Sequence, residues 1–108
     1  MDARERYDEI AADLEAREPD VQLGQMMGHP CIKAAGKIIA SFQLAGSIAF
    51  KLPNEAEREK ALALKGAVPL EPMGKGRVMK EWVYVPIAHE AKWAELAETA
   101  LRLRKEVS

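Results

Sequence analysis

The sequence holds a single cysteine, Cys31, and two histidines, His29 and His89. One cysteine cannot form an intrachain disulfide, and we therefore expect a cytoplasmic setting. The spacing of these three residues matches no common metal-ligand pattern, so no metal site is predicted. No cofactor is predicted either, because the glycine-rich segments match neither the Walker A loop nor the dinucleotide fingerprint.

The chain also lacks a marked charge of either sign and long apolar runs. Its formal net charge is −1, which argues against a dedicated nucleic-acid-binding protein, since such proteins usually carry a clear basic excess. No apolar run approaches the roughly 18 residues that span a bilayer. The charged N-terminus, Met1 to Ile10, resembles neither a signal peptide nor a transit peptide. We therefore expect no membrane segment.

Aromatic residues make up only 6% of the chain, so aliphatic side chains must fill most of the core. Apolar residues account for 48% and charged residues for 31%, a mixture typical of soluble globular proteins. A chain of 108 residues suits one domain and leaves little room for two. We therefore predict a single domain over residues 1–108.

Three segments have the apolar period of a helix, at about residues 2–17, 54–65 and 89–105. Asn54 is a good N-cap for the second helix, and Gly66 suits the position just after its end. The expected apolar stripe of the first helix is Tyr7, Ile10, Ala11 and Leu14. The expected apolar stripe of the third helix is Trp93, Leu96, Ala97, Ala100 and Leu101.

Between the first two helices the pattern changes to that of β-strands. Residues 37–43 and 47–52 alternate between apolar and polar side chains, which indicates a sheet covered on one side only. Residues 44–46 are short enough to form the hairpin turn that joins them. These features favour antiparallel pairing.

Two weaker strands are predicted upstream, at residues 24–28 and 31–34, and Pro30 is expected to interrupt the pairing between them. A further strand is predicted at Met79 to Val85. Because the elements run as helix, several strands, helix, strand and helix, the pattern predicts an α+β domain.

The segment from Gly66 to Pro86 contains the sequence "GKGR" at Gly74 to Arg77. Glycines with neighbouring cations can form a concave anion-binding site from backbone N–H groups, with Lys75 and Arg77 adding charge. No helix is predicted directly after this sequence, however, and lone glycine signals are weak. We favour a structural turn over a ligand-binding loop.

In the strand that follows, Lys80, Trp82 and Tyr84 alternate with Glu81, Val83 and Val85. Since large aromatic residues usually belong to the core, we expect the two rings to pack beneath a helix near Trp93. The alternative is a partly exposed surface that stacks on a ligand or contacts a partner. The candidate binding residues are Lys75, Arg77, Lys80 and Trp82.

No set of residues resembles an assembled catalytic site. A nucleophilic pair of Cys31 with a histidine is conceivable, but Cys31 lies in a strand-like run with no evident third group to orient the base. Most carboxylates lie on helix faces, where solvated charge is the default. We therefore predict that the protein is not an enzyme.

The order of motifs resembles the N-terminal domain of TfoX/Sxy-type competence regulators. The resemblance is carried by "MMGHPCIKAAGKIIASF", then "IAFKL", then "GAVPLEPMGKGRVMKEWVYVP" and a final amphipathic helix, and it covers nearly the whole chain. Domains of the YjbR/MmcQ type are the near neighbour. Competence regulators of this type usually carry a second, C-terminal domain, so the resemblance concerns their first domain alone.

This resemblance implies a curved antiparallel sheet with N-terminal, middle and C-terminal helices packed on it. It also implies a regulatory or interaction role with no established reaction, so a protein partner or self-association is expected. The alternative is a nucleic-acid-binding module that uses a local basic patch. That patch would consist of Lys75, Arg77 and Lys80 together with Lys33, Lys37 and Lys51.

Overall fold

The computed structural model describes residues 2–26, 28–43, 46–70 and 79–106. Within these residues the helices are α1 (Ala3–Arg17), α2 (Glu55–Leu62) and α3 (Glu90–Glu106), and a 3-10 turn, η1 (Ile87–His89), leads into α3. The strands are β1 (Val21–Met26), β2 (His29–Ala34), β3 (Lys37–Gln43), β4 (Ser47–Lys51), β5 (Val68–Leu70) and β6 (Met79–Pro86).

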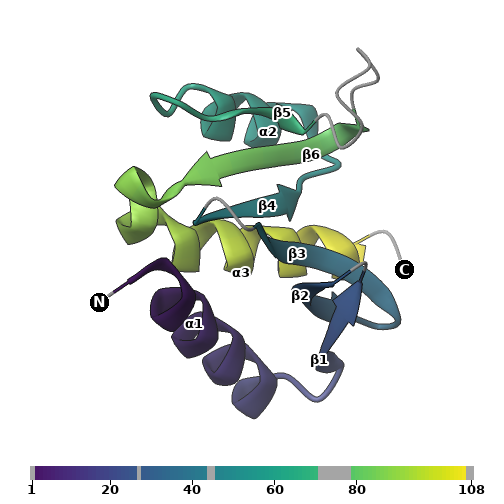
Figure 1. Ribbon diagram of the computed structural model, residues 1–108. Helices are drawn as coiled ribbons and strands as arrows, with labels where there is room; N and C mark the ends of the chain where they lie inside the picture. The colour runs from purple at the N-terminus through teal and green to yellow at the C-terminus, as the bar shows by residue number, and fades with distance from the viewer. Residues whose placement is uncertain (1, 27, 44–45, 71–78, 107–108) are drawn as a thin grey trace.

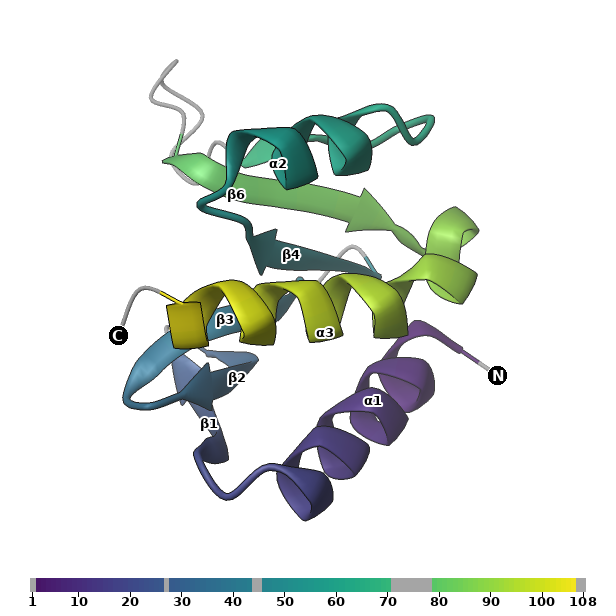
Figure 2. The same ribbon diagram turned by 180° about the vertical axis from the view of Figure 1, so that it is seen from behind.

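The strands form one open, curved antiparallel sheet in the order β1-β2-β3-β4-β6-β5. Helices α2 and α3 both lie behind this sheet in Figure 1 and in front of it in Figure 2. Helix α1 packs against α3 and β1. The predicted α+β fold is therefore confirmed, with one sheet face covered by helices and no helix of the described residues on the other, which we call the open face.

Helix α1 begins where its sequence supplies hydrogen-bond partners for the free backbone N–H groups of a first turn. The Asp2 carboxylate accepts from the Glu5 N–H at 2.8 Å, and the Glu5 carboxylate accepts from the Asp2 N–H at 3.2 Å. The predicted stripe is buried along its whole length, from Tyr7 to Leu14. The Tyr7 ring contacts that of Phe42 at a centroid distance of 5.4 Å.

Helix α2 has the predicted cap, because the Asn54 side chain accepts from the Glu57 N–H at 3.0 Å. It ends at Leu62, however, which is three residues earlier than predicted. Gly66 therefore lies in the following turn, where its φ of +88° favours glycine over any other residue. The His89 ring hydrogen-bonds the Lys65 carbonyl at 2.6 Å and so ties this turn to η1.

The predicted strands are confirmed as β3, β4 and β6, although β4 buries four successive residues, Ser47 to Phe50, and does not alternate in burial. The prediction for Pro30 was wrong. Pairing of β1 with β2 runs unbroken from Val21 opposite Ala34 to Met26 opposite His29, with Pro30 opposite Gln25. Pairing of β2 with β3 begins only at Cys31. Pro30 thus has a partner strand on one side, and its missing N–H can face the other side.

Strand β5 was missed by sequence reasoning, which assigned its residues to a connection. Three residues, one of them Pro69, are too few to show a period of two. Their extended conformation depends on pairing with β6, where Val68 lies opposite Tyr84. β5 is consequently an edge strand, a position in which proline is tolerated.

The core fills the space between the covered sheet face and the helices. Ile32, Ala40, Phe50 and Val83 lie side by side in register across the sheet, and each is at most 1% exposed. From α3, the predicted stripe residues Trp93, Ala97, Ala100 and Leu101 are buried, whereas Leu96 is only partly buried. None of the helices in the described part of the chain is long and apolar enough to cross a membrane.

Candidate ligand-binding surface

The open face of the sheet carries a row of residues, most of which are sequence neighbours of the buried row Ile32, Ala40, Phe50 and Val83. Cys31, Ser41, Ala49, Tyr84 and Val68 lie opposite one another in register across five strands. Because side chains alternate between the two faces of a strand, this row points away from the helices. Small residues at its centre are flanked by larger ones, and Figure 1 views the molecule from this side.

Trp82 and Tyr84 belong to this open face, so the expectation that they pack beneath a helix near Trp93 was wrong. The two valines that alternate with them, Val83 and Val85, occupy the core and are fully buried. Both aromatic side chains are instead half-buried. The alternation in β6 was read correctly, but the sequence alone does not show which face of a strand the helices cover.

Three lysines from three different strands meet Trp82 at one end of the sheet. Lys33 comes from β2, Lys37 begins β3, and Lys51 ends β4 directly opposite Trp82 of β6. With Gln25, Gly36 and Ile38 they line a shallow depression of about 380 Å³. We call Lys33, Lys37, Lys51 and Trp82 the lysine–tryptophan face.

Local packing brings these side chains together. A Cβ atom built on Gly24 would lie 3.7 Å from Cε of Lys33, so the lysine stem runs across the glycine of the neighbouring strand. Lys37 follows a tight turn in which Ala35 and Gly36 both have positive φ, 50° and 83°. From behind, the Arg104 guanidinium donates to the carbonyl oxygens of Ala34 and Ala35 at 3.2 and 3.1 Å.

Sequence reasoning missed the role of Arg104, because cations are common near the end of a helix, where they suit its dipole, and its partners lie far away in the chain. Besides holding the β2–β3 turn, Arg104 lines a second depression of about 340 Å³ with Lys37 and Lys51. These two lysines therefore form a ridge between two shallow hollows. Only the tertiary contact of α3 with the turn places a fourth cation at this end of the sheet.

The charged residues of the strands are mostly lysines, although the whole chain has a net charge of −1. Among the described strands only β6 contains an acidic residue, Glu81. Its carboxylate lies 3.9 Å from Lys51 Nζ, and both side chains are partly exposed. Lys33 and Lys37 form no ion pair with the part of the chain that the structure describes. Lys33 and Lys37 are thus available to an anionic ligand.

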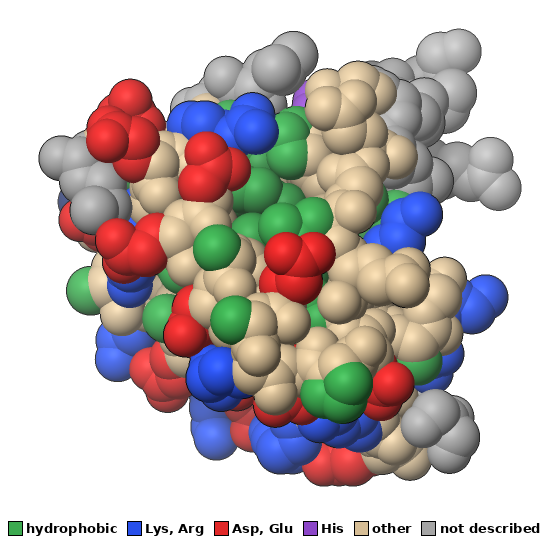
Figure 3. All heavy atoms as spheres, turned by 90° about the horizontal axis from the view of Figure 1, so that it is seen from below, with side chains coloured by type: hydrophobic (Ala, Val, Ile, Leu, Met, Phe, Trp, Pro, Cys, Tyr) green, Lys and Arg blue, Asp and Glu red, His purple; other side chains and the backbone are tan. Residues whose placement is uncertain are grey.

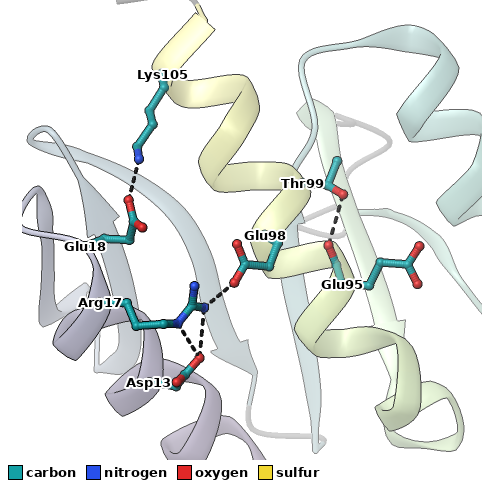
Figure 4. A network of polar contacts seen from close by, with 7 residues as sticks. All are labelled: Asp13, Arg17, Glu18, Glu95, Glu98, Thr99 and Lys105. Carbon is teal, nitrogen blue, oxygen red and sulfur yellow. Dashed lines mark hydrogen bonds and ion pairs between the residues drawn. The ribbon is translucent and has the colours of Figure 1, made fainter.

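The helical side of the molecule is different, because its charges neutralise one another. Arg17 of α1 lies between Asp13 of the same helix and Glu98 of α3. Glu18 pairs with Lys105 (Figure 4). The hydrogen bonds that Arg17 donates to Glu98 and Asp13 raise the pKa of its guanidinium, while the hydrogen bond from Lys105 holds the pKa of Glu18 below its usual range. Seen from below, acidic and basic side chains are intermingled (Figure 3).

The remaining predicted binding residues cannot be placed in the same way. Lys75 and Arg77 lie outside the described residues, so the choice between a turn and a ligand-binding loop at "GKGR" stays open. Lys80 belongs to β6, but its side chain is also outside the described set. Of the predicted binding residues, Trp82 alone has a described side chain, and the structure groups it with Lys33, Lys37 and Lys51.

Cys31 is a poor candidate for a nucleophile. Its side chain is 0% exposed, and burial raises the pKa of the thiol, against the opposing effect of Lys33. His29 lies two residues away on the same strand, and its buried Nδ1 has no hydrogen-bond partner within the described structure. No cluster of three metal-ligating side chains occurs in these residues either.

Cys31 should therefore react with Ellman's reagent roughly 100-fold or more slowly in the native protein than in the denatured chain, because a buried neutral thiol must wait for an opening of the fold. The measurement compares the absorbance time course at pH 8 without and with guanidinium chloride. Equal rates in the two conditions would contradict the placement of Cys31 in the sheet interior.

No protein-family model matches this sequence, and no curated protein or solved structure is significantly similar to it. The resemblance to the N-terminal domain of TfoX/Sxy-type regulators therefore stays a prediction. The functional argument accordingly rests on the chemistry of the open sheet face.

Proposed function

We propose that this protein is a cytoplasmic, non-enzymatic regulatory domain that binds an anionic partner through the lysine–tryptophan face. One observation carries the proposal. Four strands bring three lysines and a half-buried tryptophan to the same end of the open face, where Glu81 is the single acidic strand residue among those described. Lys33 and Lys37 have no ion-pair partner among the described residues, so a negatively charged ligand would supply one.

Two further points support binding over catalysis. The buried Cys31, whose thiol has a raised pKa, is unsuited to nucleophilic attack. The resemblance to the TfoX N-terminal domain implies a regulatory or interaction role with no established reaction. Both points agree with a surface that has cations and an aromatic ring but no paired acid and base.

The proposal predicts that a double variant, Lys33→Gln with Lys51→Gln, loses retention on immobilised heparin. The matched control is Lys60→Gln with Lys92→Gln, which removes the same charge from α2 and α3, where each lysine pairs with a glutamate. The salt concentration at elution is the measurement, and melting temperatures establish that both variants are folded. Equal loss of retention in the two variants would show that net charge alone is responsible.

Self-association is a second candidate, favoured by the two edges of the sheet. Leu23 on edge strand β1 is 42% exposed and Val68 on edge strand β5 is 48% exposed. Uncovered edge strands can pair with a second chain. Sedimentation velocity over a hundredfold range of protein concentration distinguishes a monomer from such an assembly.

A further inference from the structure

We infer that the partner of the lysine–tryptophan face is a single strand of nucleic acid, with its phosphates at the lysines and one base stacked on Trp82. This inference rests on the proposed function and names the ligand. It joins two properties of the site: three lysines, of which Lys33 and Lys37 have no ion-pair partner among the described residues, and an aromatic side chain in the same depression.

The first property is the arrangement of the cations. Lys33, Lys37 and Lys51 come from three neighbouring strands, β2, β3 and β4, and line one depression, although Lys37 lies opposite Ala34 and not opposite Lys33. Strands in a sheet are about 4.8 Å apart, which spreads three charges over a short path instead of concentrating them at one point. Such a path suits a linear polyanion better than a single small anion.

The second property is Trp82, which a simple polyanion site does not require. Its side chain is half-buried and lies opposite Lys51 in the sheet. Trp93, by comparison, is fully buried, and its indole N–H donates to the Val85 carbonyl at 3.2 Å. An accessible aromatic ring beside cations is the usual platform for bases of single-stranded nucleic acid.

The combination favours a single strand over a duplex. Bases of a duplex are stacked on each other, whereas bases of a single strand are free to stack on a protein side chain. Trp82 shares a shallow hollow with lysine stems and cannot reach between paired bases without unstacking them.

The experiment titrates the protein with a fluorescently labelled oligothymidylate of about 12 nucleotides, a length within the range of single-domain binders. Anisotropy reports binding, and intrinsic tryptophan emission reports Trp82, because Trp93 is shielded from solvent. We expect quenching of the accessible tryptophan on binding. We also expect a slope of log K against log salt of about −2, as for three neutralised phosphates of a single strand.

Four variants connect the signals to residues. Trp82→Ala should weaken binding at least about 10-fold by loss of stacking. Trp82→Phe should retain most of the affinity but lose the quenching of tryptophan emission on binding. Lys33→Gln with Lys51→Gln should flatten the salt slope. Lys60→Gln with Lys92→Gln should leave affinity and slope unchanged.

The outcomes separate this inference from the proposed function. Retention on heparin without binding of the oligonucleotide would overturn the inference and leave the anionic-partner proposal intact. Equal affinity for a duplex of the same length, with unchanged tryptophan emission, would overturn it as well. Failure to bind either heparin or the oligonucleotide would overturn both.

Discussion

Replacing Trp93 by alanine should lower the free energy of unfolding by about 3–5 kcal/mol, the usual cost of removing a buried large aromatic side chain. Trp93 is 0% exposed, and its N–H satisfies the Val85 carbonyl at the end of β6. The variant loses apolar burial and this hydrogen bond together. Thermal denaturation should show a fall in melting temperature of at least about 10 °C.

Two control variants separate these contributions. Trp93→Phe keeps a buried ring and removes the indole donor, so its cost should be smaller, about 1–2 kcal/mol. Trp82→Ala removes the same side chain from the open face, where it is half-buried, and should cost about 1 kcal/mol. Comparable losses for Trp82→Ala and Trp93→Ala would mean that the two tryptophans are equally important to the core.

Leu14→Ala should have the second large effect, about 2–5 kcal/mol of unfolding free energy. Leu14 is 1% exposed on the buried face of α1, the helix that closes the core beside α3 and β1. Its truncation leaves a cavity beneath a helix whose remaining contacts with α3 include exposed ion pairs, which contribute little. Urea denaturation followed by circular dichroism provides the measurement.

Leu23→Ala is the matched control, because it makes the same chemical change at a leucine that is 42% exposed on edge strand β1. Its cost should stay below about 1 kcal/mol, since little apolar surface returns to water. A similar, small effect at both leucines would indicate that α1 is weakly held and that the core depends on α3 alone.

Positive and negative charges are unevenly distributed over this protein, which its net charge does not show. A net charge of −1 argues against a dedicated nucleic-acid-binding protein but leaves a local basic patch open. In the structure, the acidic residues concentrate on the helices, where arginines and lysines neutralise them (Figure 4). The strands keep their lysines with a single described carboxylate, Glu81, among them. The expected affinity for an anion therefore depends on the charge of this local surface and not on the net charge of the chain.

The secondary structure could be predicted from local patterns because its causes are local. The stripe from Tyr7 to Leu14, the Asn54 cap and the alternation along β3, β4 and β6 all depend on neighbours a few residues away in the chain. The same holds for the α+β class, which follows from the order of these elements. Where the expectation failed, at Pro30 and at Val68 to Leu70, the outcome depended on which neighbouring strand each segment pairs with, which its own residues do not show.

The composition of the site depended on long-range packing in the same way. Alternation in β6 grouped Trp82 with Tyr84, but the helices cover the opposite face and bury Val83 and Val85. Lys33, Lys37 and Lys51 were already candidates as separate residues, and strand order is what gathers them beside Trp82. Local sequence thus specifies which side chains share a strand face, whereas burial of the larger apolar surface selects the face that the helices cover and so leaves the other face free to bind.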